Sequence, residues 1–172
     1  TKVLDNKLVN LGLKYQKTSD IAKLTAKFIS KGKIIGLVQG KMEFGPRALC
    51  NRSIIASPVD GSINQKLNKR LNRTEFMPFA PVIRYENAKK IFPELKSYLA
   101  AQYMTVTANV DSEIAKTIPA VVHIDGTARP QIINKENNLR MYKILEQYEE
   151  LTGILALINT SFNAHEEPIV CS

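Results

Sequence analysis

The predicted fold is built around the sequence Gly40-Lys41-Met42-Glu43-Phe44-Gly45-Pro46-Arg47-Ala48-Leu49-Cys50-Asn51-Arg52-Ser53. This stretch follows the apolar run 34–38, which predicts a short buried strand. A loop that leaves the end of a strand is a usual ligand site in α/β folds. Gly40 and Gly45 permit backbone angles closed to other residues, and Pro46 fixes the turn before Arg47. The cations of the loop could therefore converge on a polyanion, although ordinary surface turns have the same composition.

Three separated blocks of the chain form one pattern: Gln39–Leu49 with Asn51–Ser53, Pro78–Pro81, and Asn159–Asn163 with Glu167–Val170. This pattern resembles the nodulation and antibiotic O-carbamoyltransferases of the NodU/CmcH type. The resemblance covers the carboxy-terminal part of such an enzyme, which is similar to YrdC-like domains. It implies an α/β fold with a twisted mixed sheet and flanking helices.

The resemblance also implies a reaction. The YrdC-like part of these enzymes takes ATP and carbamoyl phosphate to carbamoyl adenylate, with Mg²⁺ carried by the ATP. An amino-terminal sugar-kinase-like part then passes the carbamoyl group to a hydroxyl acceptor. The whole of residues 1–172 is therefore expected to be one domain, a fragment of a larger enzyme, and its acceptor is not encoded here.

On this resemblance we expect two groups of site residues. Arg47, Arg73, Arg129 and Ser161 are the expected catalytic residues. Arg129, Ser161 and Asn159 are expected at the nucleotide, and Arg47 and Arg73, together with Lys41 and Arg52, around the phosphates and the carbamoyl group. The expected ATP- and carbamoyl-phosphate-binding residues are Lys41, Arg52, Lys69, Arg70, Thr127, Asn159 and Asn163. Arginine suits this task because its planar fork can bind two phosphate oxygens at once.

Two positions depart from the family pattern. Cys50 stands where the family usually has glycine, which could require a different backbone angle. Met77 stands where an arginine commonly precedes the Pro-Phe-Ala-Pro block. The loss of that cation puts triphosphate binding in question unless Arg70 or Arg73 substitutes.

Length and composition agree with one globular domain. The chain has 172 residues, of which 44% are hydrophobic and 23% charged, an ordinary globular composition. No apolar run is long enough to span a membrane, and the amino terminus resembles neither a signal peptide nor an initiator sequence. The formal charge of +8 predicts attraction to anions. Cys50 and Cys171 lack CxxC spacing and are expected to be free thiols of a reducing cytoplasm.

Apolar periodicity and turn residues predict alternating helices and strands. A short helix or extended arm is expected before residue 19. Helices are expected at about 20–31, with Ser19 as N-cap and Gly32 at the C′ position, and at 62–71, 87–91 and 138–151, the last stopped by Gly153. Strands are expected at 33–39, 52–57, 78–83, 104–110, 120–124 and 154–158, with Asp111 and Ser112 turning the chain.

Polar clusters follow three of these predicted strands. They are residues 41–53, 127–131 and 159–163. If the strands share a sheet and end at one edge, the clusters can form a single pocket. Its cations, hydroxyls and amides would suit the binding and displacement of phosphates.

Other chemistries lack their motifs. There is no GxxxxGK[ST] loop and no GxSxG elbow around Ser161. His123 and His165 are the only histidines, and no His/Cys cluster has metal-ligand spacing. His123 is better explained as a hydrogen-bonded core residue than as a base, Arg47 could simply pair with Glu43, and Glu167 could cap a turn.

A basic RNA-binding module is the alternative function. Aromatic residues make up only 7% of the chain and are not interleaved with the basic runs, which argues against a stacking platform for nucleic acid.

Overall fold

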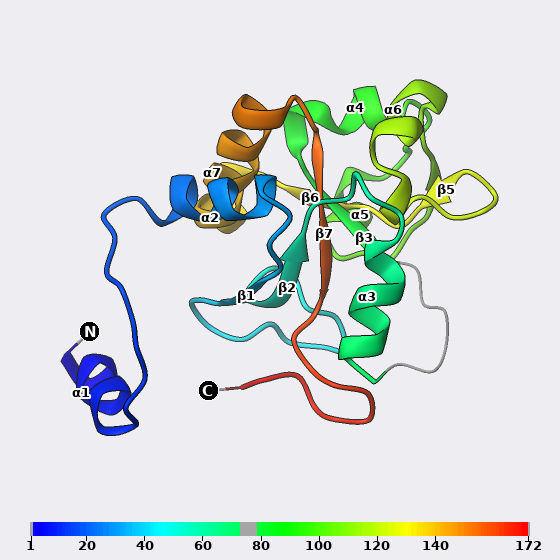
Figure 1. Ribbon diagram of the computed structural model, residues 1–172. Helices are drawn as coiled ribbons and strands as arrows, with labels where there is room; N and C mark the ends of the chain where they lie inside the picture. The colour runs from blue at the N-terminus through cyan, green and yellow to red at the C-terminus, as the bar shows by residue number, and fades with distance from the viewer. Residues whose placement is uncertain (1, 73–78, 172) are drawn as a thin grey trace.

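The computed structural model describes residues 2–72 and 79–171. Its main sheet has the strand order β1-β2-β7-β3-β6, and a separate two-stranded ribbon pairs β4 with β5 (Figure 1). The strands of the main sheet are β1 (Ile35–Val38), β2 (Arg52–Ala56), β3 (Ala80–Arg84), β6 (Gln131–Ile133) and β7 (Ala156–Ser161), and the ribbon is β4 (Ala108–Asn109) with β5 (Thr127–Ala128).

The pairing makes the main sheet mixed, as expected. β3 and β6 are parallel, whereas the other neighbouring strands are antiparallel. Ser53 of β2 lies opposite Ser161, and Ala80 of β3 lies opposite Asn159. The end of β7 is therefore flanked by the starts of β2 and β3, so the three inner strands bring these residues together at one end of the sheet.

Helices cover both faces of the sheet (Figure 1). One core contains Ile55, Val82 and Leu157 and packs under α2 (Ile21–Ser30) and α7 (Lys135–Thr152). The neighbouring residues Ile54 and Ile83 point into the other core, because successive side chains of a strand alternate between faces. The helices on that second side are α3 (Ile63–Arg70), α4 (Ala88–Ile91), which follows the 3₁₀ turn η1 (Tyr85–Asn87), α5 (Tyr98–Gln102) and α6 (Ser112–Thr117).

The ends of the two long helices follow capping rules. Asp20 caps α2 by accepting a hydrogen bond from the Lys23 amide at 3.0 Å, so the prediction of Ser19 was one residue early. Gly32 and Gly153 end the helices with φ of +74° and +72°, confirming both predicted stops. α7 starts earlier than predicted, with a kink at Asn138.

The region from 98 to 133 differs from its prediction. The strand expected at 104–110 shrinks to β4, and the strand expected at 120–124 is wrong, because Pro119–Val121 form the 3₁₀ helix η2. Helices α5 and α6 and strand β6 were not predicted. Asp111, expected to turn the chain, instead caps α6 by accepting from the amides of residues 113 and 114. Short apolar segments do not distinguish a buried strand from a buried helical turn.

Helix α1 (Lys2–Asn10) stands apart from the body of the molecule and is joined to it by an extended segment (Figure 1). This agrees with the expected short helix or arm. Across the described residues, none of the helices is long and apolar enough to cross a membrane.

Candidate active site

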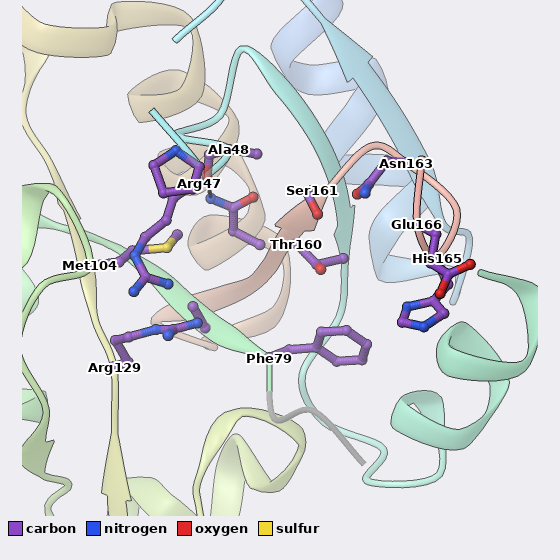
Figure 2. Close-up of a pocket in the computed structure, with 13 residues that line it drawn as sticks. Arg47, Ala48, Phe79, Met104, Arg129, Thr160, Ser161, Asn163, His165 and Glu166 are labelled. Carbon is purple, nitrogen blue, oxygen red and sulfur yellow. Dashed lines mark hydrogen bonds between the residues drawn. The ribbon is translucent and has the colours of Figure 1, made fainter. Parts of the chain in front are cut away.

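A cavity of about 260 Å³ lies at the end of the sheet's central strand, β7 (Figure 2). It is lined by the 46–48 loop, the start of β3, the segment before β6 and the end of β7. The lining residues are Pro46, Arg47, Ala48, Phe79, Ala80, Met104, Arg129, Asn159, Thr160, Ser161, Asn163, His165 and Glu166. All three polar clusters of the sequence contribute to it, so the prediction of a shared pocket is confirmed.

Arg47 and Arg129 bring two guanidinium groups to the same side of this cavity (Figure 2). Burial and the neighbouring charge of Arg47 lower the pKa of the Arg129 guanidinium. The Nε atom of Arg129 is buried and has no hydrogen-bond partner among the described residues. Because two like charges repel and a buried donor needs an acceptor, an anion bound between these side chains would relieve both costs.

Asn159 forms part of the cavity wall and is only 2% exposed. Its Nδ2 donates to the carbonyl oxygen of Ala48 at 3.0 Å and to Oε1 of Gln131 at 2.6 Å. Its Oδ1 is buried without a partner in the part of the chain that the structure describes. The amide is thus held through its nitrogen, and its oxygen is a buried acceptor without a partner among the described residues.

Cys50 is hydrogen-bonded to Gln131, the residue that accepts from Asn159. Its thiol donates to Oε1 of Gln131 at 3.3 Å, and burial raises the pKa of this thiol. The residue has a φ of +74°, a left-handed angle that glycine adopts without strain. At this position, where the family usually has glycine, Cys50 thus adopts a backbone angle that glycine would take without strain.

Glu43 organises the loop that carries Arg47. Its Oε1 accepts hydrogen bonds from the amides of Leu49, Asn51 and Arg52, at 2.6, 2.6 and 3.2 Å. Within residues 2–72 and 79–171 no ion pair joins Glu43 to Arg47. The alternative explanation of Arg47 as a partner of Glu43 is therefore wrong, and the Arg47 side chain is left to the cavity.

Ser161 and Asn163 lie where β7 runs into the following turn. Ser161 faces the cavity beside Thr160 (Figure 2). Asn163 donates from Nδ2 to the carbonyl oxygen of Glu167 at 2.8 Å, and its Oδ1 is buried without a partner among the described residues. Glu167 contributes its backbone to this turn, and the expectation that it caps a turn stays a prediction.

Two predicted binding residues of the loop do not line the cavity. Arg52 is buried and donates to the carbonyl oxygens of Gln39 and Asn51 at 2.9 Å, and to that of Cys171 at 3.0 Å. These contacts tie the loop to the carboxy-terminal segment. Lys41 is exposed and also lies outside the lining.

Three more predicted residues lie elsewhere. Lys69 and Arg70 are exposed on α3, and Arg70 borders a different cavity near the start of β1. Thr127 donates to Oδ1 of Asp125 at 2.7 Å and lies 3.0 Å from Nδ1 of His123. His123 is thus hydrogen-bonded, although half-buried and not in a strand. The predictions for Arg73 and Met77 lie outside the described residues.

Sequence reasoning missed several contributors. Gln131 acts through hydrogen bonds to residues distant in the chain, and Glu43 through hydrogen bonds to amides of its own loop. Met104 lines the cavity with a φ of +54°. Nothing in the local sequence pointed to Met104, whereas an acid inside a basic glycine-containing loop could have indicated Glu43. No group of three or more metal-ligating side chains occurs in the described ranges.

Comparison with known proteins decides the family. The model of the carbamoyltransferase C-terminus matches residues 26–172. The chain belongs to this family. It is a domain of the type found in nodulation and antibiotic O-carbamoyltransferases, as the three sequence blocks predicted.

Curated relatives agree with this membership. A protein of Methanocaldococcus jannaschii described as uncharacterized is 43% identical over 86% of this chain. Nodulation protein NolNO of Sinorhizobium fredii is 34% identical over 99% of it, and the 3'-hydroxymethylcephem-O-carbamoyltransferase of Amycolatopsis lactamdurans is 34% identical over 83%. The chain spans 24%, 26% and 26% of their lengths, so this domain corresponds to about a quarter of each relative.

Solved structures share the fold. The structure of full-length HypF in a phosphate- and nucleotide-bound form matches 90% of this chain with a TM-score of 0.60 and 20% identity, over 19% of the HypF chain. The YrdC-like fold expected from the sequence is therefore confirmed.

Proposed function

We propose that this domain forms carbamoyl adenylate from ATP and carbamoyl phosphate, as one part of an O-carbamoyltransferase. The observation that carries the proposal is the pairing of Arg47 with Arg129 in one cavity, with no carboxylate neutralising either side chain among the described residues. Such a pair suits a substrate with several phosphate oxygens.

The chemistry requires two steps. Water cleaves carbamoyl phosphate to carbamate and inorganic phosphate. A carbamate oxygen then attacks the α-phosphorus of ATP, forming a new P–O bond while the bond from the α-phosphorus to the bridging oxygen breaks and pyrophosphate leaves. The second step collects negative charge around phosphorus, and fixed cations that face this charge lower the barrier.

Each polar residue of the cavity would have its own role in this reaction. Arg47 and Arg129 would bind phosphate and carbamate oxygens and hold them in line. The Ser161 hydroxyl lies at the end of β7, where it would donate to a phosphate oxygen, and the side-chain amides of Asn159 and Asn163 would position the substrates. Mg²⁺ would arrive with ATP and be held by the phosphates.

The comparisons support the same assignment. A relative named as an O-carbamoyltransferase shares a third of its aligned residues with this chain, and a similar fold occurs in a protein described as phosphate- and nucleotide-bound. This chain spans only about a quarter of the length of its relatives. We assign transfer to an acceptor to a sugar-kinase-like part of the same enzyme. We place the whole enzyme in the cytoplasm, where ATP is made.

The test is pyrophosphate release by this chain with ATP and carbamoyl phosphate. We expect release that requires both substrates and is lost in Ser161→Ala, with an unchanged melting temperature. Exposed Ser30, which lies on α2 and outside the cavity lining, provides the control Ser30→Ala, for which full activity is expected. Release that is unchanged in Ser161→Ala would contradict the role of this residue. Binding of duplex RNA without binding of ATP would favour the RNA-binding alternative.

A further inference from the structure

Two asparagines of the cavity carry buried oxygens that lack hydrogen-bond partners among the described residues. They are Oδ1 of Asn159 and Oδ1 of Asn163. Buried polar atoms in native proteins almost always have a partner, and leaving one unpaired costs about 1–3 kcal/mol. Atoms of this kind inside a ligand cavity indicate what the ligand must supply.

The orientation of each amide follows from its neighbours. Nδ2 of Asn159 lies 3.0 Å from the carbonyl oxygen of Ala48, and Nδ2 of Asn163 lies 2.8 Å from the carbonyl oxygen of Glu167. A backbone carbonyl can only accept, so the atom beside it must be the NH₂ group. In both residues the remaining atom is therefore an acceptor, and the bound group that satisfies it must be a donor.

Gln131 makes this orientation firm at Asn159. Its Oε1 accepts from Asn159 at 2.6 Å and from the Cys50 thiol at 3.3 Å, and the Gln131 side chain is 1% exposed. Reversing the Asn159 amide would bring its oxygen against two acceptors at once. The buried acceptor of this cavity-lining residue is thus built into the fold.

The depth of Asn159 limits the size of the donor. This residue is 2% exposed, at the cavity wall next to Ala48, whose chain neighbour is Arg47. A group bound in this cavity can meet both the guanidinium of Arg47 and the amide of Asn159, because both residues line it. A carbamoyl group matches this pattern, since it combines acceptor oxygens with an NH₂ donor on a single carbon. Asn163 is more exposed and remains available to the larger nucleotide.

We propose that Asn159 determines specificity for the carbamoyl group by accepting a hydrogen bond from its amino nitrogen. This inference rests on the proposed function for the identity of the substrate. An acyl group with a methyl in place of the amino group would leave Oδ1 of Asn159 buried and unpaired. A site built to hydrogen-bond a substrate strongly rejects an analogue that lacks the bonding group.

The test uses two stable probes that do not react. Phosphonoacetamide carries the amide of carbamoyl phosphate on a phosphonate, and acetonylphosphonate replaces its amino group by methyl. Calorimetry with this chain is expected to show binding of phosphonoacetamide about tenfold tighter or more, because the analogue leaves a buried acceptor unpaired. In Asn159→Leu the two affinities should become equal.

Asn163→Leu is the matched control, since it removes the other unpaired acceptor. It should retain the preference for phosphonoacetamide even if it weakens both probes. Should Asn159→Leu not fold, the double variant Gln131→Leu/Asn159→Leu removes both hydrogen-bonding partners and should lose the preference in the same way.

Equal binding of the two probes by the original chain would overturn the inference, and so would a preference that survives in Asn159→Leu or disappears only in Asn163→Leu. Absence of binding by both probes would also overturn it. The proposed function is judged separately by pyrophosphate release, which does not use these probes, so the two failures are distinguishable.

Discussion

The surroundings of Arg84 and of Arg129 show two ways of burying a guanidinium group. Arg84, at the end of β3, donates to Oε2 of Glu149 at 2.7 Å and to the Tyr142 hydroxyl at 3.2 Å. Asn87 donates to the same carboxylate at 2.7 Å. This cluster neutralises its own charge and satisfies its own donors.

Arg129 has no such carboxylate among the described residues, and the nearest influential charge is another cation, Arg47. Its Nε and the Oδ1 atoms of Asn159 and Asn163, all without hydrogen-bond partners in the described part of the chain, belong to residues that line one cavity. Local rules of pairing and charge balance are usually broken where a protein binds a ligand. The contrast agrees with a stabilising role for Arg84 and with the substrate-binding role proposed for Arg129, Asn159 and Asn163.

The largest expected effect belongs to Arg129→Ala. Removing one donor from a preorganised anion site lowers turnover by about 10²–10³-fold, and pyrophosphate release should fall accordingly. Thermal unfolding should occur at the same temperature or higher, because the variant removes a repulsive charge. Arg129→Lys, which keeps the charge but not the fork, should recover only part of the activity. A large loss of stability in Arg129→Ala would show that Arg129, like Arg84, mainly stabilises the fold.

Arg84→Met should show the opposite pattern. Loss of this partly buried cation leaves the Glu149 carboxylate without its partner, and we expect the free energy of unfolding to fall by about 2 kcal/mol. Urea denaturation measures this change. The exposed pair Lys116–Glu113 supplies the control Lys116→Met, for which no measurable change is expected. Pyrophosphate release should be unaffected in both variants at a temperature where they are folded.

Gly36→Ala should affect both stability and activity modestly. A Cβ at this position of β1 would lie 2.8 Å from Cε1 of Phe162, so the ring must move. Overpacking of this kind costs about 1–3 kcal/mol, and the shift reaches the segment between Ser161 and Asn163. A lower melting temperature together with weaker ATP binding in calorimetry is expected. Gly61, where a Cβ would meet no described atom within 4 Å, gives the control Gly61→Ala.

The smallest effect concerns the two thiols. Cys50 is buried and its pKa is raised by burial, whereas Cys171 is exposed. Because only the thiolate reacts, a thiol reagent at about pH 8 should label one cysteine in the folded chain and both in urea. Mass spectrometry should place the first label on Cys171. Rapid labelling of Cys50 in the native chain would show that the wall behind Asn159 opens.

The predicted site residues line the cavity where a motif and the cavity coincide. Arg47, Asn159 and Ser161 lie within blocks whose backbone directly forms the cavity edge. Arg129 was correctly expected in the pocket although the strand placed before it, at 120–124, does not exist. Arg129 reaches the cavity from the segment before β6 and not from a strand at 120–124. The prediction that placed Arg129 in the pocket therefore depended on the family resemblance rather than on the predicted strand.

Arg52 and Thr127 show what the sequence could not reveal. Both are polar residues beside the same motifs, yet Arg52 is engaged by backbone carbonyls and Thr127 by Asp125 and His123. The direction of a side chain and the partners that compete for it depend on the packing of the whole domain. Residue type and spacing do not contain this information.

Periodicity and turn glycines by themselves determined strands β1, β2, β3 and β7 and the carboxy-terminal ends of the two long helices, because these features depend on residues close together in the chain. The sequence also determined the family, through three blocks of residues. Only the tertiary structure decided which polar atoms stay unpaired. The groups that orient Asn159 lie 111 and 28 residues away from it in the chain, and a hydrogen bond over such a separation exists only once the strands have paired.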